Sequence, residues 1–142
     1  MARPRDHALI SLALAAAFTA ATGSRKAGLA ALAVGTLIDA DHLVDLLVVY
    51  RTKQRDWLIM PLHGWEHLLA GALILSRRPG WGLLAAVISY GVHVSTDHWT
   101  NLLGPAKIYS ILYRTRCGFR ASRLNIPFEP HDWVEQNPLK WV

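Results

Sequence analysis

The chain has 142 residues, enough for one domain, and 52% of them are hydrophobic while 18% are charged. Its mean hydropathy of +0.21 is high for a soluble protein, and its six Trp residues fit a membrane interface, where indole rings favour the headgroup region. The net charge of +5 favours an anionic partner. Because the basic residues form neither a basic helix nor zinc-finger spacing, we expect no nucleic acid partner. The single cysteine, Cys117, excludes an internal disulfide and a Cys-rich zinc site.

Four apolar stretches rich in Ala and Leu predict helices over residues 7–22, 26–50, 63–76 and 80–101. The first and third are shorter than the ~20 residues that span a bilayer comfortably, and the second and fourth are long enough but carry charges. The first stretch also fits a signal peptide. We nevertheless predict an all-α fold: a small integral membrane four-helix bundle over residues 1–103.

Three clusters of carboxylate and imidazole side chains interrupt these apolar stretches. Ionisable groups are costly to bury there, so they mark a functional site, and their types are the ones that a divalent metal needs. The clusters are Asp39-Ala-Asp41-His42-x-x-Asp45, His63-Gly-Trp-Glu66-His67 and His93-x-x-x-Asp97-His98.

All three clusters come to the same end of an up-and-down bundle. The start of an odd helix and the end of an even helix share one face, and the clusters occupy those positions. That end also carries more Lys and Arg than the other, for example Arg5, Arg51 and Lys53. By the positive-inside rule it faces the cytoplasm. The sequence thus predicts a multi-pass protein of the inner (plasma) membrane with both termini cytoplasmic.

Helical spacing selects the metal ligands within these clusters. An i, i+4 pair is the usual way for a helix to present two ligands to one ion. A lone His at a helix end, such as His7, is more often a satisfied polar residue. We expect a divalent metal, zinc first and manganese or another metal as alternatives, with one ion or two. The predicted ligands are Asp39, His42, His63, His67, His93 and Asp97.

A general base is also available among these residues. The segment from His63 to His67 spells H-x-x-E-H, the inverted zinc-protease motif, but the chain is too short for the enzymes that use it. Glu66 could still act as a base on a metal-bound water, and Asp41 is the other candidate.

The ordered set of clusters resembles the YdjM-like (LexA-binding, inner-membrane-associated) metal-dependent hydrolases over roughly residues 5–103. Residues 39–42 match the D-x-D-H segment of that family, residues 63–67 its central H-x-x-x-x-H segment, and residues 92–100 its S-H-x-x-x-D-x-x-T segment. His7 matches its N-terminal His. The central segment is one residue shorter here, with Glu66 in place of the usual Thr, and Ile38 replaces a usual Pro. The resemblance implies a membrane-bound, metal-dependent hydrolase.

Residues 104–142 form a second region, which we expect to be an irregular interfacial tail or a lid. Gly104-Pro105 ends the last helix, and basic residues then alternate with aromatic and aliphatic ones, a pattern suited to a membrane surface. Trp133 and Trp141 could fold this region over the site.

The predicted function is metal-dependent hydrolysis of an anionic (phospho)ester, with membrane lipids as partners and an anionic lipid as one possible substrate. The alternative is a non-enzymatic membrane metal or proton carrier, or a regulatory scaffold. A haem-binding bundle with His63 and His93 as axial ligands would leave the carboxylates without a role. The oligomeric state is not predicted.

Overall fold

The computed structural model describes residues 4–54, 56–101 and 106–124. Within these residues the chain is helical, and apart from one isolated bridge between Trp57 and Arg120 it forms no strand pairing. The predicted all-α class is therefore confirmed. In chain order the elements are α1 (Pro4–Thr22), α2 (Arg25–Leu37), the 3₁₀ helix η1 (Ile38–Asp41), α3 (His42–Thr52), α4 (Trp65–Arg77), α5 (Trp81–Asn101), η2 (Ala106–Tyr109), α6 (Ile111–Arg116) and η3 (Ala121–Arg123).

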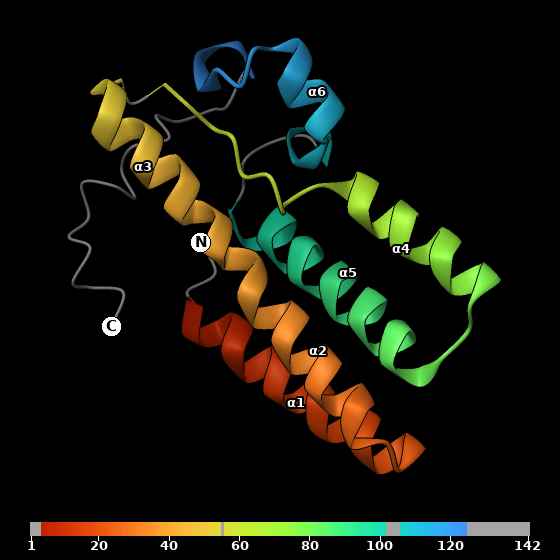
Figure 1. Ribbon diagram of the computed structural model, residues 1–142. Helices are drawn as coiled ribbons and strands as arrows, with labels where there is room; N and C mark the ends of the chain where they lie inside the picture. Colours follow the sequence, from red (N-terminus) through yellow and green to blue (C-terminus); the bar gives the residue numbers. More distant parts are fainter. Residues whose placement is uncertain (1–3, 55, 102–105, 125–142) are drawn as a thin grey trace.

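Helix α2 packs against both α1 and α5, and α4 lies along α5 (Figure 1). Small residues make this close packing possible, because Ala27 and Ala31 of α2 are fully buried. At Gly35 an added Cβ would collide with the side chains of Ser11 and Ser89. The missing side chain thus lets the backbone of α2 approach α5 near the end where the polar clusters lie.

The predicted second helix, residues 26–50, is divided by the 3₁₀ turn η1. Helices α2 and α3 continue as one long rod in Figure 1, and α3 extends beyond the bundle. Asp45 ties α3 to the following loop, since its Oδ1 accepts hydrogen bonds from the backbone N–H groups of Ile59 at 2.7 Å and Met60 at 3.4 Å. The break places Asp39 and Asp41 in the short turn η1.

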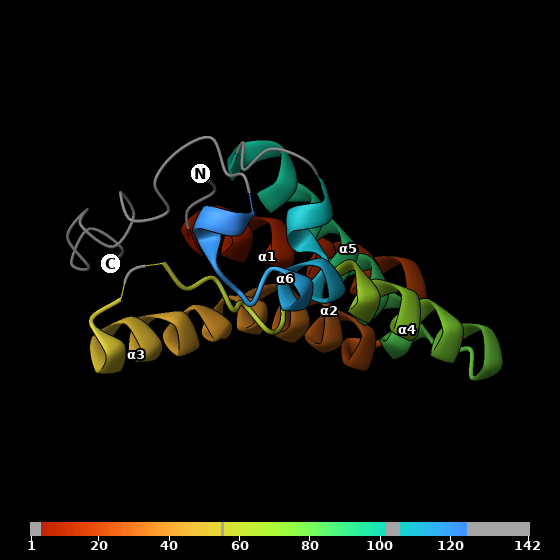
Figure 2. The same ribbon diagram turned by 90° about the horizontal axis from the view of Figure 1, so that it is seen from above.

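Residues 106–124 form a small helical layer at the same end of the molecule, which Figure 2 shows from above. The layer has its own apolar core with the loop before α4 and the end of α5. The described part of the predicted tail is therefore packed and helical, whereas Trp133 and Trp141 lie outside the described residues. The buried members of this core are Leu58, Met60, Val94, Ile108, Tyr109, Ala121 and Leu124.

The expectation of a multi-pass inner (plasma) membrane protein with cytoplasmic termini is wrong. In the described parts of the chain no helix is both long and apolar enough to cross a bilayer. Helices α2 and α4 have only 13 residues each because η1 divides the second stretch and the third is short. Helix α5 has 21 residues but includes His93, Asp97 and His98, and α1 has 19 but is Ala-rich with charges in its first turn.

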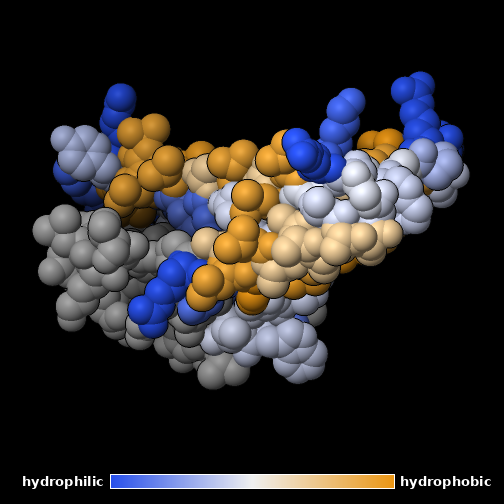
Figure 3. Space-filling view, turned by 90° about the horizontal axis from the view of Figure 1, so that it is seen from below, coloured by the Kyte–Doolittle hydropathy of each residue, from blue (hydrophilic) through white to orange (hydrophobic). Residues whose placement is uncertain are grey.

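Large apolar side chains are nevertheless exposed over much of the surface. Figure 3 shows them spread across one face, with hydrophilic side chains at its rim. Leu29 is 66% exposed, Leu43 65% and Leu69 71%, so the exposed apolar surface involves α2, α3 and α4. These residues explain why the apolar stretches suggested a bundle in lipid.

Candidate metal centre

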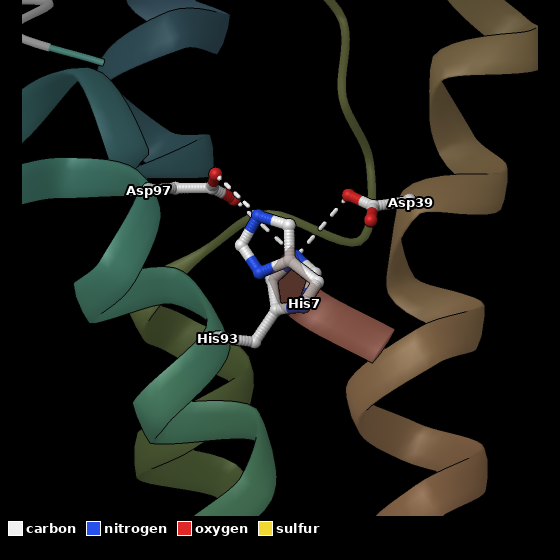
Figure 4. A group of neighbouring side chains, drawn as sticks. All are labelled: His7, Asp39, His93 and Asp97. Carbon is white, nitrogen blue, oxygen red and sulfur yellow. Dashed lines mark hydrogen bonds and ion pairs between the residues drawn. The ribbon is translucent and has the colours of Figure 1, made fainter. Parts of the chain in front are cut away.

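Side chains from separate parts of the chain meet at one end of the bundle. Figure 4 shows His7 from the first turns of α1, Asp39 from η1, and His93 with Asp97 from α5. His63, from the loop before α4, completes the group, and its side chain is fully buried. A buried His/Asp cluster that could hold a metal ion is therefore present, as the sequence predicted.

Four donor atoms of this cluster surround a common point. His63 Nε2 lies 3.2 Å from His93 Nε2 and 3.1 Å from Asp97 Oδ2. His93 Nε2 lies 3.3 Å from that same oxygen and 3.2 Å from Asp39 Oδ1, which is 3.6 Å from His63 Nε2. Donors that bind one ion tetrahedrally at ~2.0–2.1 Å are separated by roughly 3.3 Å. These five separations are compatible with a tetrahedral metal site.

In His63 and His93, the hydrogen bond that Nδ1 makes determines that Nε2 is the nitrogen that faces the centre. His93 Nδ1 lies 2.8 Å from the carbonyl oxygen of Gly35, which only accepts, so Nδ1 carries the proton. His63 Nδ1 lies 3.0 Å from both carboxylate oxygens of Asp41 and donates to them. When these imidazoles are neutral, each would point the lone pair of Nε2 inward. Such outer hydrogen bonds are the usual support of metal-binding histidines.

Charge coupling within the cluster is strong. Burial lowers the pKa of His63, but hydrogen bonds with Asp39, Asp41 and Asp97 outweigh burial and raise it to about 11. The pKa of His93 rises to about 9 because its hydrogen bonds with Asp39 and Asp97 likewise exceed the effect of burial. Burial alone would raise the pKa of Asp97, yet its imidazole partners hold it well below the usual range. Positive charge is therefore required at the centre, and protons or a cation can supply it.

Two further histidines flank the four donors. His7 Nε2 lies 3.0 Å from Asp97 Oδ1, and its ring stacks on His93 with the centroids 4.0 Å apart. His42 Nε2 lies 3.8 Å from Asp39 Oδ1, which follows from η1: in a 3₁₀ helix, side chains at i and i+3 lie on the same side. The side chains of Asp39 and His42 are 21% and 34% exposed, so the centre opens to solvent beside them.

The loop that carries His63 is fixed from three sides. Asp41 Oδ2 accepts from the N–H of Leu62 at 2.7 Å, and the Tyr90 hydroxyl accepts from the N–H of Gly64 at 3.0 Å. Arg114 of α6, whose side chain is fully buried, donates from Nη2 to the carbonyl oxygen of His63 at 2.5 Å. Through Arg114 of α6, the layer of residues 106–124 thus helps to position the candidate ligand His63.

The structure does not bring every predicted site residue to the centre. His67 is exposed, and its Nε2 donates to the carbonyl oxygen of Pro61 at 2.8 Å. Glu66 accepts from the Ser110 hydroxyl at 2.5 Å and from the N–H of Ile111 at 3.0 Å, so it caps the start of α6. Asp41 contacts the centre only through His63. The predicted ligands Asp39, His42, His63, His93 and Asp97 all lie in the cluster.

His7 and Arg114 are not among the predicted site residues. His7 is a lone histidine in the local sequence, but two signals point to it: its place at the start of the first helix, at the same end as the three clusters, and its match to the N-terminal His of the YdjM-like family. No sequence pattern distinguishes Arg114, because it is one of several basic residues in a region expected to be irregular.

Comparisons of this chain with protein-family models, curated proteins and solved structures find no match. Membership of the YdjM-like family therefore stays a prediction that rests on the short motif segments.

Proposed function

We propose that this protein is a metal-dependent hydrolase whose metal is held by His63, His93, Asp39 and Asp97. The observation that carries the proposal is the 3.2 Å separation of the two Nε2 atoms beside two carboxylate oxygens. Two neutral imidazoles whose Nε2 lone pairs face each other at this distance would repel each other unless a positive charge lies between or beside them. A divalent cation bound by these donors would supply that charge.

The donor set favours zinc, with manganese as the alternative. Two imidazole nitrogens and two carboxylate oxygens at tetrahedral spacing suit Zn²⁺. A catalytic zinc also needs a position for water or substrate. With four protein donors this would be a fifth coordination position, on the solvent-exposed side next to Asp39 and His42. Neither Glu66 nor Asp41 faces that position. Both are therefore positioning residues: Glu66 caps α6 and Asp41 orients the imidazole of His63.

The proposed reaction is hydrolysis of an anionic phosphoester. A bound ion would supply the nucleophile by lowering the pKa of its water to near 7. In the net reaction the water oxygen would bond to phosphorus, the bond to the ester oxygen would break, and the water's proton would pass to the departing alcohol. The net charge of +5 favours an anionic substrate.

We propose further that the protein binds an anionic lipid surface. The α1–α2 and α4–α5 turns lie at the end of the molecule away from the cluster (Figure 1) and carry Arg25, Lys26, Arg77 and Arg78. Apolar side chains are exposed on the helices between those turns and the cluster. Sedimentation with anionic and zwitterionic vesicles tests this partner: binding should require anionic lipid and weaken with salt.

Metal analysis combined with an ester hydrolysis assay tests the main proposal. The protein, stripped by a chelator and reloaded with Zn²⁺ or Mn²⁺, should hydrolyse p-nitrophenyl phosphate or its diester. His93→Ala and Asp97→Ala should lose both metal and hydrolysis, whereas the matched control His67→Ala should keep both. Full metal content in the two cluster variants would overturn the metal site. Bound metal without hydrolysis across a broad panel of esters would favour the carrier or scaffold.

A further inference from the structure

The cluster offers more donors than one tetrahedral ion can use. Six side chains bring imidazole or carboxylate atoms to it, whereas a four-coordinate ion takes four. These side chains separate into two groups, and within each group the ligand atoms all lie within 4.8 Å of one another. The groups are His7, Asp39, His93 and Asp97, and Asp39, His42 and His63.

We propose that the cluster holds two divalent cations side by side and that Asp39 is their shared ligand. Asp39 is the one residue common to both groups, and its carboxylate has two oxygens with which to bridge two ions. An imidazole nitrogen binds only one ion, so His93 serves the first ion and His63 the second. Their Nε2 atoms are 3.2 Å apart, which allows the ions to lie at the ~3.5–4 Å separation of two-metal hydrolytic sites.

Charge balance also favours two ions over one. The six donor side chains include two carboxylates, those of Asp39 and Asp97, and neutral imidazoles are required for metal binding. One divalent ion leaves a net charge of 2 − 2 = 0, which does not attract an anionic ester. Two ions leave 4 − 2 = +2, which attracts it. This step rests on the proposed function, whereas the donor count does not.

The two positions differ in exposure. The first group is mainly buried, since His7, His93 and Asp97 are each less than 5% exposed. The second group opens to solvent through His42, whose side chain is 34% exposed. The ion next to His42 therefore binds more weakly, exchanges faster and meets the substrate first.

Titration of the chelator-stripped protein with MnCl₂ tests the inference without reference to activity. Mass spectrometric metal analysis at saturation should give two equivalents in the unaltered chain and about one in His42→Ala. Electron paramagnetic resonance should show exchange coupling between the two Mn²⁺ ions in the unaltered chain and an isolated ion in the variant. The matched control His67→Ala, which removes an exposed histidine outside the cluster, should retain two coupled ions.

His42→Gln provides a second variant if His42→Ala does not keep the helical circular dichroism of the parent. Saturation at one equivalent in the unaltered chain would overturn the inference, and so would two equivalents in both His42 variants. Two bound ions without ester hydrolysis would leave the inference standing and remove the proposed function. One bound ion together with ester hydrolysis would remove the inference and leave the proposed function standing.

Discussion

Asp41 holds the imidazole of His63 by the nitrogen that faces away from the candidate metal centre. Both of its carboxylate oxygens lie 3.0 Å from Nδ1, although the two residues are 22 positions apart in the chain. The same carboxylate accepts from the N–H of Leu62 at 2.7 Å. One side chain therefore sets the position of the loop, the orientation of the ring and the tautomer that presents Nε2 to the centre.

Asp41→Asn should weaken metal binding without removing the site. Loss of a carboxylate that supports a ligating histidine typically costs 10–100-fold in metal affinity. Competition with a chromogenic chelator measures the change, while the number of ions at saturation should stay the same. Asp45→Asn is the matched control, because Asp45 accepts from the loop backbone and does not touch an imidazole. Equal affinities in the two variants would contradict this role for Asp41.

Asp45→Asn should stabilise the protein at neutral pH. Burial is the main reason why the pKa of Asp45 rises from 3.8 to about 6. The folded state then binds the proton more tightly than the unfolded state, so stability falls as the pH rises from about 4 to about 6. An amide oxygen keeps the two backbone hydrogen bonds and carries no charge. The variant should be more stable by on the order of 1–3 kcal/mol at pH 7.

Urea unfolding at pH 7 and at pH 4 measures that difference. The gain should be full at pH 7 and largely gone at pH 4, where the carboxyl group is protonated in the folded state. A gain that does not depend on pH would point to packing and not to ionisation of Asp45.

Glu66→Gln should lower stability above pH 5 and leave metal content unchanged. Burial alone would raise the pKa of Glu66, but hydrogen bonds from Ser110, Ile111 and Leu112 outweigh burial and lower it to about 2. A depressed folded-state pKa means that the carboxylate stabilises the protein above the unfolded value of 4.5 and that this stability is lost as the pH falls towards 2. The difference in unfolding free energy between parent and variant should therefore shrink as the pH falls from 5 to 3. Loss of metal in Glu66→Gln would instead place Glu66 at the centre.

Gly35→Ala should destabilise the bundle and disturb the centre together. The added methyl group would meet the hydroxyls of Ser11 and Ser89, and overpacking of this kind costs about 1–3 kcal/mol. It would also move the Gly35 carbonyl, to which His93 donates, so metal affinity should fall. Thermal unfolding and chelator competition report the two effects.

Gly82→Ala is the matched control for that change. Gly82 also lies in a helix, α5, but an added Cβ there meets open space. The variant should be as stable as the parent or more stable by up to about 1 kcal/mol, because Ala favours helix over Gly. Similar losses in both variants would mean that close packing at Gly35 is not the cause.

Local sequence was enough to predict the helical class and most of the residues of the cluster. Ala- and Leu-rich stretches have a strong local preference for helix, so α1, α4 and α5 lie close to the predicted ranges. The chemistry of carboxylate and imidazole is likewise independent of the fold, so Asp39, His63 and His93 could be named as ligands from their types and spacing.

Long-range packing determines which side chains meet and which support them. His63 and His67 were predicted as ligands and Glu66 as a general base of one segment, but contacts of Glu66 with Ser110 and of His67 with Pro61 direct both away from the centre. His7 reaches Asp97 across 90 positions, a relationship that no local pattern carries. The break at η1 and the layer of residues 106–124 depend on long-range packing. Local preference therefore sets the elements, while contacts between distant segments set the site.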